Sequence, residues 1–198
     1  MKMDESGLFP MEPERLEKVV TFLQSTEQLK NTLRRSVTSQ GRTESTAEHT
    51  WRLCMMVLVL QNDLGDVDIL KLFKICLIHD LGETLSGDVP AVEQSANDGR
   101  HDRERADLIT LCAPLPEDIR LEILQLWEEY EASETKEAIL AKGLDKLETV
   151  FQHGIGRNPS DFNYAFNLDY GRSATDRHAL TRQMRELADN ITRAKMPD

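Results

Sequence analysis

The part of the sequence that most constrains the fold is an apolar run that ends in a histidine and an aspartate. The apolar residues after Asp68, which occupy nearly every side of a helix, are Leu70, Leu72, Phe73, Ile75, Cys76, Leu77 and Ile78. A helix of this kind normally lies in the protein interior. His79 and Asp80 follow at its carboxyl end, where burying an aspartate is costly unless a cation or a hydrogen-bond donor meets it. The run predicts a central helix with polar chemistry at one end; an Asp–His hydrogen-bonded pair is the alternative explanation.

Helical spacing of apolar residues continues along the rest of the chain, and we find no convincing series of alternating strands, so we expect an all-α fold. Ser45 and Glu48 form a capping box, which predicts the start of a helix that runs to about Leu64. We also expect a helix that begins at Pro13 and a short second helix that contains Leu29, Leu33 and Arg34. The remaining expected helices cover about 68–78, 100–112, 116–132, 134–153 and 175–194. Glycine, proline and small polar residues predict irregular structure over 36–45, 83–92 and 154–172.

Length and charge narrow the class of protein. The length of 198 residues favours a single domain that covers residues 1–198. We find no apolar run of roughly 18 to 20 residues and no export signal in the acidic first residues, so we expect a cytoplasmic protein that does not bind membranes. Cys54, Cys76 and Cys112 lie in apolar stretches and are expected to be reduced core thiols. The net charge of −11 argues against nucleic-acid binding, although a cation and a few arginines could still attract a small anion.

One further histidine suggests a metal centre. His49 falls in the first turn of the helix that follows Ser45, and imidazole together with carboxylate suits a borderline divalent metal ion. Such an ion with open coordination positions would make the protein a hydrolase. Asp145 lies in a strong helical pattern and, by itself, would be interpreted as an ordinary exposed helix carboxylate. Spacing alone does not select it.

The order of these residues resembles a known family. The segments that carry the resemblance are 44–49 (ESTAEH), 79–80 (HD), 82–83 (GE), 87–90 (GDVP) and 145–148 (DKLE). Together they are similar to the HD-domain metal-dependent phosphohydrolases, most closely to the branch of 5′-deoxynucleotidases, over about residues 29–152. The resemblance implies an all-α HD-domain helical bundle, usually a homodimer, that removes phosphate from nucleoside 5′-monophosphates. It also implies that His49, His79, Asp80 and Asp145 bind the divalent metal ion.

The resemblance suggests further site residues. Glu83 would orient or deprotonate the attacking water or protonate the leaving group, and its alternative is a solvent-facing loop carboxylate. Asp88 would act as the acid at the 5′ oxygen or position the water, and otherwise it is a turn former. Arg34 is expected to bind phosphate through its guanidinium, with Lys146 as a second donor. The division of roles between Glu83 and Asp88 stays open.

The sequence departs from the deoxynucleotidases after Arg34, where they have a tryptophan and this chain has Arg35. The preference for deoxyribose is therefore open, and Trp51 could supply another aromatic wall or belong to the core. His101, His153 and His178 match no position of the family, so we interpret them as incidental.

Two other functions compete with a nucleoside monophosphate phosphohydrolase. One is an HD hydrolase of another phosphoester, such as a nucleoside triphosphate, a cyclic nucleotide or an alarmone. The other is a catalytically inactive HD binding module, against which the presence of Glu83 and Asp88 argues. Manganese, cobalt, zinc and magnesium all suit a His and Asp ligand set, so the metal is open too.

Overall fold

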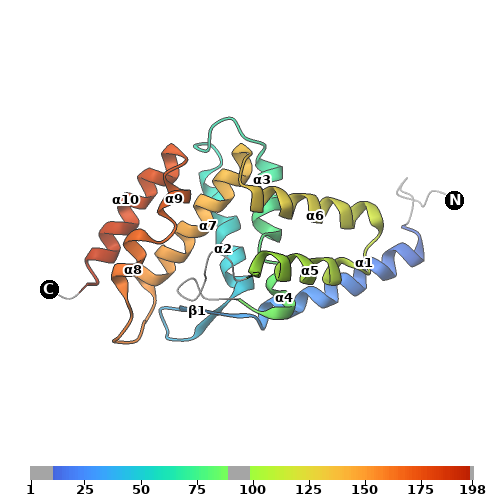
Figure 1. The fold of residues 1–198 in the computed structure, drawn as a ribbon, viewed down its shortest axis with the longest axis horizontal. Helices are drawn as coiled ribbons and strands as arrows, with labels where there is room; N and C mark the ends of the chain where they lie inside the picture. Colours follow the sequence, from blue (N-terminus) through green and yellow to red (C-terminus); the bar gives the residue numbers. More distant parts are fainter. Residues whose placement is uncertain (1–10, 89–98, 197–198) are drawn as a thin grey trace, which may run out of the picture.

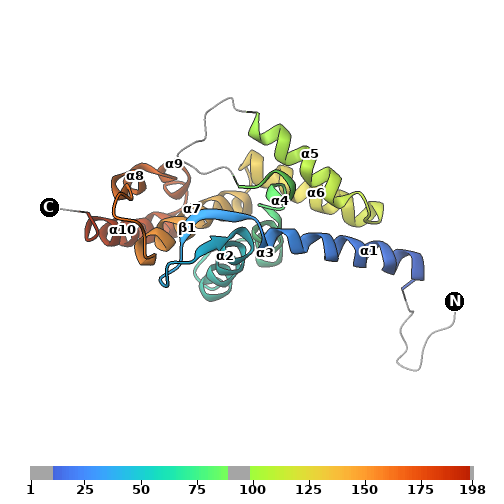
Figure 2. The ribbon, with the colours of Figure 1, turned by 90° about the horizontal axis from the view of Figure 1, so that it is seen from below.

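The computed structural model describes residues 11–88 and 99–196. The helices are α1 (Pro13–Ser25), α2 (Thr46–Leu60), α3 (Ile69–Ile78), α4 (Glu83–Ser86), α5 (Arg100–Cys112), α6 (Glu117–Ala132), α7 (Lys136–Ile155), α8 (Tyr164–Asp169), α9 (Arg172–Thr175) and α10 (Ala179–Arg193). Figures 1 and 2 show an elongated molecule with α2, α3 and α7 near its middle, α1, α5 and α6 toward one end, and α8 to α10 toward the other. The expected all-α fold is confirmed, apart from one small hairpin.

The central helix is the one that the apolar run predicts. The Asp68 side chain caps α3 by accepting a hydrogen bond from the backbone N–H of Lys71 at 3.0 Å. Leu72 and Ile75 are fully buried against α2 and α7. However, Leu70 is 66 % exposed, so α3 is covered on most sides rather than on all of them. The packing directs the carboxyl end of α3, with its histidine and aspartate, toward α7.

The neighbouring helices begin where local capping predicts. Ser45 accepts a hydrogen bond from the Glu48 N–H while the Glu48 carboxylate accepts one from the Ser45 N–H, so the capping box at the start of α2 is confirmed. The hydroxyl of Thr135 caps α7 by accepting a hydrogen bond from the Ala138 N–H at 3.2 Å. Leu144 and Leu147 on α7 are fully buried in the core that α2 and α3 share. The two caps fix the residues at which α2 and α7 begin.

The predicted short helix with Leu29, Leu33 and Arg34 is wrong. A 3-10 turn η1 (Thr26–Lys30) is followed by an antiparallel hairpin of β1 (Leu33–Val37) and β2 (Thr43–Ser45). Gly41, with φ of +86°, lies in the turn of this hairpin. The carbonyl of Val37 accepts a hydrogen bond from the side chain of Gln152 at 2.6 Å. Contacts with α7 thus favour a strand where the local sequence alone favoured a helix.

Other boundaries also differ from the sequence-based expectation. Helix α2 ends at Leu60 rather than about Leu64. The segment 83–92, expected to be a loop, begins with the short helix α4, and Gly87 directly after this helix has φ of +85°. Residues 89–92 of the expected loop lie outside the described residues. The expected irregular tract 154–172 contains α8 and the start of α9.

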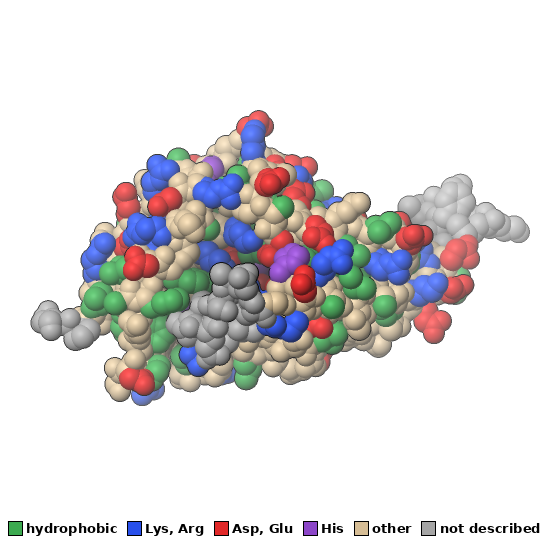
Figure 3. Space-filling view, viewed as in Figure 1, with side chains coloured by type: hydrophobic (Ala, Val, Ile, Leu, Met, Phe, Trp, Pro, Cys, Tyr) green, Lys and Arg blue, Asp and Glu red, His purple; other side chains and the backbone are tan. Residues whose placement is uncertain are grey.

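No helix among residues 11–88 and 99–196 is long and apolar enough to cross a bilayer. Acidic and basic side chains are interspersed over the face drawn in Figure 3.

A buried arginine joins the last helix to the segment before it. Arg185 on α10 is 1 % exposed and pairs with Asp189 at 2.6 Å. Its guanidinium also donates to the backbone carbonyls of Asn167 at 2.5 Å and Tyr170 at 2.7 Å. A buried charge is tolerated when it is paired and hydrogen-bonded, as this one is. Arg185 therefore fixes the path of the chain through α8.

We predict that Arg185→Met lowers the free energy of unfolding by about 3 kcal/mol, because it leaves one buried carbonyl, one partly buried carbonyl and part of the Asp189 charge without a donor. Urea unfolding followed by circular dichroism measures the change. The matched control is Arg182→Met, on the exposed side of the same helix. Equal stabilities of the two variants would contradict the prediction.

Candidate metal centre

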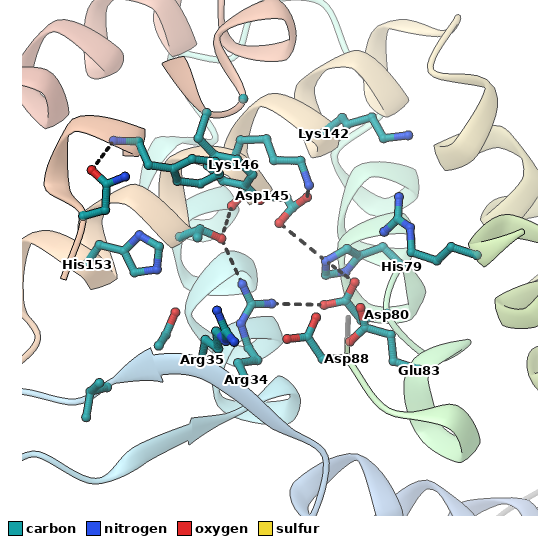
Figure 4. A pocket seen from close by; sticks show the side chains of 18 of the residues that line it. Arg34, Arg35, His79, Asp80, Glu83, Asp88, Lys142, Asp145, Lys146 and His153 are labelled. Atoms are coloured by element: carbon teal, nitrogen blue, oxygen red, sulfur yellow. Dashed lines mark hydrogen bonds and ion pairs between the residues drawn. The ribbon is translucent and has the colours of Figure 1, made fainter. Parts of the chain in front are cut away.

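Four side chains from three helices meet at one point. His49 comes from the first turn of α2 and Asp145 from the middle of α7, while His79 and Asp80 directly follow the last residue of α3. Nε2 of His49 lies 3.2 Å from Oδ1 of Asp145 and 3.7 Å from Oδ2 of Asp80. Nε2 of His79 lies 3.1 Å from Oδ1 of Asp80 and 4.0 Å from Oδ1 of Asp145. Figure 4 shows His79, Asp80 and Asp145 facing one another. The structure thus brings together all four side chains that the sequence singled out.

Hydrogen bonds determine which ring nitrogen of each histidine faces this point. Nδ1 of His79 lies 2.9 Å from the carbonyl oxygen of Cys76, which can only accept, so Nδ1 carries the proton. Nδ1 of His49 makes a short hydrogen bond with the carboxylate of Glu148, which is completely buried. Both Nε2 atoms then face the two aspartates, and in the neutral ring each would present its lone pair to a cation held there. A histidine held in this way by an outer carboxylate or carbonyl is typical of metal sites.

Polar atoms without partners support a cation at this point. In the described ranges, Nε2 of His49, Nε2 of His79 and Oδ2 of Asp80 are buried and have no hydrogen bond. Buried polar atoms almost always have a partner, so three orphans beside one another need an explanation. One ligand atom from each of His49, His79 and Asp145 lies within 4.8 Å of the others. A divalent cation fits this donor set, because one ion among these three atoms would satisfy both orphaned imidazole nitrogens. Asp80 lies beside the three-residue group, with Oδ1 3.1 Å from Nε2 of His79.

The acidity of the carboxyl groups suits the same cation. Burial alone would raise the pKa of Asp80, but the adjacent imidazoles of His79 and His49 outweigh burial and lower that pKa to about 2. For Asp145 burial acts in the same direction, and the charge of Lys146 leads the effects that hold its pKa well below the usual value. Both carboxylates are therefore ionised near neutral pH and able to bind a cation.

Two further carboxyl groups lie beside the candidate ligands. Glu83, at the start of α4, is buried and accepts a hydrogen bond from the hydroxyl of Thr46 at 3.3 Å. Burial and the charge of Asp80 raise the pKa of Glu83 well above its usual value. Burial also raises the pKa of Asp88, although a hydrogen bond with Glu83 opposes this. The two groups form a hydrogen-bonded pair that can share a proton.

Two cations complete the polar surface. The guanidinium of Arg34, on β1, donates to the hydroxyl of Thr149 at 2.9 Å and lies 3.6 Å from Asp80. Burial lowers the pKa of Arg34 and the charge of Asp80 raises it, with a net increase. The ammonium of Lys146 lies 2.9 Å from Oδ2 of Asp145, whose charge outweighs burial and raises the lysine pKa. Both side chains stay charged, as an anion site requires.

These groups line a cavity of about 700 Å³, which is within the usual range for small-molecule sites. Its walls also carry the cations Arg35, Arg100 and Lys142 and the acid Glu104. Burial raises the pKa of Glu104 to about 7, despite the opposing charge of Arg100. Away from the candidate ligands the walls become aromatic; these residues are His153, Phe162, Phe166 and Tyr170.

Sequence reasoning missed several residues of the site. Glu148 and Thr149 follow Asp145 by three and four positions, so they share its helix face, and this spacing is a signal that was available. Tyr130 on α6 donates to Oδ2 of Asp145 at 2.7 Å, a contact that requires the tertiary fold. His153 lines the cavity, although the sequence assigned it no role. Trp51 is 65 % exposed and does not line the cavity, so it is neither core nor an aromatic wall of the site.

Comparisons with known proteins identify the family. The family description "HD domain" matches residues 26–185, so this chain belongs to the HD domain family. The resemblance drawn from the sequence motifs is confirmed.

Named relatives and a solved structure agree with this assignment. The chain is 33 % identical over 111 residues to the human 5′-deoxynucleotidase HDDC2, a match that covers 56 % of this chain and 53 % of that protein. It is 31 % identical over 140 residues to the 5′-deoxynucleotidase hdd1 of Schizosaccharomyces pombe, covering 68 % and 70 %. The match thus spans about half of the human relative. A predicted metal-dependent phosphohydrolase from Magnetospirillum magnetotacticum shares 29 % identity, with a TM-score of 0.76 and coverage of 94 % and 97 %.

We predict that Glu148→Gln weakens divalent-metal binding about 10- to 100-fold, because a neutral amide no longer supports the basicity of the His49 imidazole. Competition with a chromophoric chelator measures the affinity. The control is His153→Ala, which changes a cavity residue that does not contact the candidate ligands, and it should bind metal as the unaltered protein does. Loss of metal from His153→Ala, or unchanged affinity in Glu148→Gln, would contradict this account.

Proposed function

We propose that this protein is a metal-dependent phosphohydrolase that removes phosphate from deoxyribonucleoside and ribonucleoside 5′-monophosphates. The observation that carries the proposal is the set of three buried, unpartnered ligand atoms, on His49, His79 and Asp80, at one end of a cavity that also holds two charged phosphate donors. The similarity to proteins named 5′-deoxynucleotidases supports the substrate class. The similarity to a predicted metal-dependent phosphohydrolase supports the reaction type.

In this proposal His49, His79, Asp80 and Asp145 hold one divalent ion. When bound, such an ion supplies a Lewis acid for a phosphate oxygen and lowers the pKa of a coordinated water. Mixed imidazole and carboxylate ligands suit manganese, cobalt, zinc and magnesium to different degrees, and the choice among them belongs to a loading experiment. Glu148 and the Cys76 carbonyl keep both imidazoles in the tautomer that the ion needs.

Arg34 and Lys146 would bind the phosphate group. The planar guanidinium of Arg34 can donate to two phosphate oxygens, and its contact with Thr149 limits its rotation. Lys146 adds a compact positive charge on the opposite side of Asp145, in the arrangement seen in Figure 4. Both donors are in place before substrate arrives, so little reorganisation accompanies the growth of negative charge on the phosphate in the transition state.

Glu83 and Asp88 would move the protons. Water attacks phosphorus, the bond between phosphorus and the 5′ oxygen breaks, and that oxygen must gain a proton. Burial and the charge of Asp80 raise the pKa of Glu83 well above its usual value, which favours its protonated form as the donor. Its hydrogen-bonded partner Asp88 then accepts the proton that the attacking water loses. Exchange of these two roles is compatible with the same pair.

A second candidate is hydrolysis of a phosphoester with more than one phosphate. The observation that favours it is the presence of Arg35, Arg100 and Lys142 on the cavity walls, in addition to Arg34 and Lys146. A nucleoside triphosphate, an alarmone or another such ester would use these cations. Arg35, in place of the tryptophan of the deoxynucleotidases, also favours acceptance of ribose as well as deoxyribose. The inactive binding module explains less, because it leaves the pair of Glu83 and Asp88 without a role.

We also propose that the protein is a cytoplasmic homodimer. Trp51, Met55 and Leu58 are exposed along one face of α2, and a contiguous exposed apolar surface of this kind often marks a protein interface. The reduced thiols of Cys76 and Cys112, both buried in the core, suit the cytoplasm.

The protein, stripped of metal and reloaded with each divalent ion, should release phosphate from nucleoside 5′-monophosphates and not from 3′-monophosphates. A panel of ribo-, deoxyribo-, di-, tri- and cyclic nucleotides, assayed for phosphate, measures this. Asp80→Ala should lower kcat/KM at least about 1,000-fold, since it removes a ligand and the charge opposite Arg34. Release from diphosphates, triphosphates or cyclic substrates alone would favour the second candidate. No release from any of them would contradict both.

For the homodimer, we predict that Trp51→Glu converts the protein to a monomer in sedimentation-velocity experiments, because it introduces a charge into the apolar face. Leu187→Glu, a change at an exposed leucine of α10, is the control and should leave the sedimentation coefficient unchanged. A monomeric unaltered protein would contradict the proposed assembly.

A further inference from the structure

The cavity is longer than a metal ion and a phosphate group require. Asp145, Thr149 and His153 lie on successive turns of one face of α7, and all three line the cavity. With a rise of about 1.5 Å per residue, His153 lies about 12 Å along the helix from Asp145. Figure 4 shows His79 and His153 on opposite sides of the pocket, with Arg34 and Arg35 between them. The far half of the cavity is thus free to receive the rest of a substrate whose phosphate lies beside Asp145.

Flat, partly exposed rings line this far half. Phe166 and Tyr170 are four residues apart and stack on each other, with ring centroids 5.3 Å apart and an interplanar angle of 27°. Phe162 packs edge-on against His153 at 5.0 Å. The ring of Tyr170 lies 5.6 Å from the ammonium of Lys146, so the aromatic surface begins one side chain away from the phosphate donors. An apolar, polarisable surface at this distance suits a nucleobase, because every base has a π-face.

His153 contributes a hydrogen-bond acceptor to the same half. Its Nδ1 donates to the side-chain oxygen of Asn167 at 2.8 Å, and Asn167 is completely buried. Nε2 is therefore the unprotonated nitrogen, provided that the ring is neutral. Burial lowers the pKa of His153, which keeps the ring neutral at physiological pH. A neutral Nε2 can accept a hydrogen bond from an O–H or N–H group and does not attract a second phosphate.

The rings are held in place by the rest of the fold. Arg185 binds the backbone carbonyls of Asn167 and Tyr170, on either side of the last turn of α8. At Gly171, which has φ of +68°, an added Cβ would lie 2.5 Å from the Cβ of Lys146, so this part of the chain packs directly on α7. A surface fixed in this way loses little conformational entropy when a ligand binds.

We propose that Phe166, Tyr170 and His153 form the nucleoside-binding half of the cavity, where the rings pack against the nucleobase and Nε2 of His153 accepts a hydrogen bond from the nucleoside. These residues would then determine specificity for nucleotides over other phosphate esters. The inference deepens the proposed function and rests on it for the location of the phosphate.

The experiment compares two substrates that differ only by the base. For the metal-loaded protein we expect kcat/KM to be higher for deoxyribonucleoside 5′-monophosphates than for 2-deoxyribose 5-phosphate. Phe166→Leu should lower this ratio about tenfold, equivalent to about 1.4 kcal/mol, chiefly through KM for the nucleotide. Phe166→Tyr keeps a ring and should keep the ratio. Leu187→Ala, at an exposed leucine outside the cavity, is the matched control.

A second measurement does not depend on hydrolysis. Saturation-transfer NMR with thymidine and deoxyadenosine should detect binding to the metal-free protein, with a signal that is lost in Phe166→Leu and kept in Phe166→Tyr. Nucleoside binding by a protein that hydrolyses no phosphate ester would support the inference while contradicting the proposed reaction. An unchanged substrate ratio in a folded Phe166→Leu protein, or no detectable nucleoside binding, would overturn the inference.

Discussion

The mutual repulsion of buried acids is the constraint on which the site depends. Asp80, Asp145 and Glu148 converge from α3 and α7, and such a concentration of negative charge is unstable in the interior without compensation. Arg34 and Lys146 supply part of that compensation from the edges, and two imidazoles lie in the middle. The orphaned Nε2 and Oδ2 atoms mark the position where further positive charge fits. The crossing of α2, α3 and α7 that builds the core also creates this concentration of charge.

Local sequence predicted the helices that position the site. The capping box of Ser45 and Glu48 and the cap of Asp68 act within one turn of the chain, so both helix starts could be deduced before the fold was known. The hairpin at 33–45 could not, because its strand is held by a hydrogen bond from Gln152, more than a hundred residues away. An alternation of apolar and polar residues over only five positions predicts a strand weakly, and the long-range contact is not visible in the sequence.

The site residues that could be predicted from the sequence are those whose burial costs the most free energy without a partner. His79 and Asp80 were conspicuous because they end an apolar helix, whereas Asp145 looked like a surface carboxylate and was found only through family resemblance. Tyr130 and His153 gave no sequence signal, because their place at the cavity depends on how α6 and α7 pack. The spacing of Asp145 and Glu148 was visible in the sequence, but only the fold shows that His49 of α2 contacts Glu148 of α7.

The separation of the cavity into two halves has an evolutionary consequence. The four converging side chains belong to α2, α3 and α7, while the aromatic wall comes from the later segment at 162–170, which Arg185 attaches to α10. Mutations in that later segment can reshape one half of the cavity without displacing the other. Descendants of such a gene could therefore diversify in the molecules they accept while inheriting the same reactive centre.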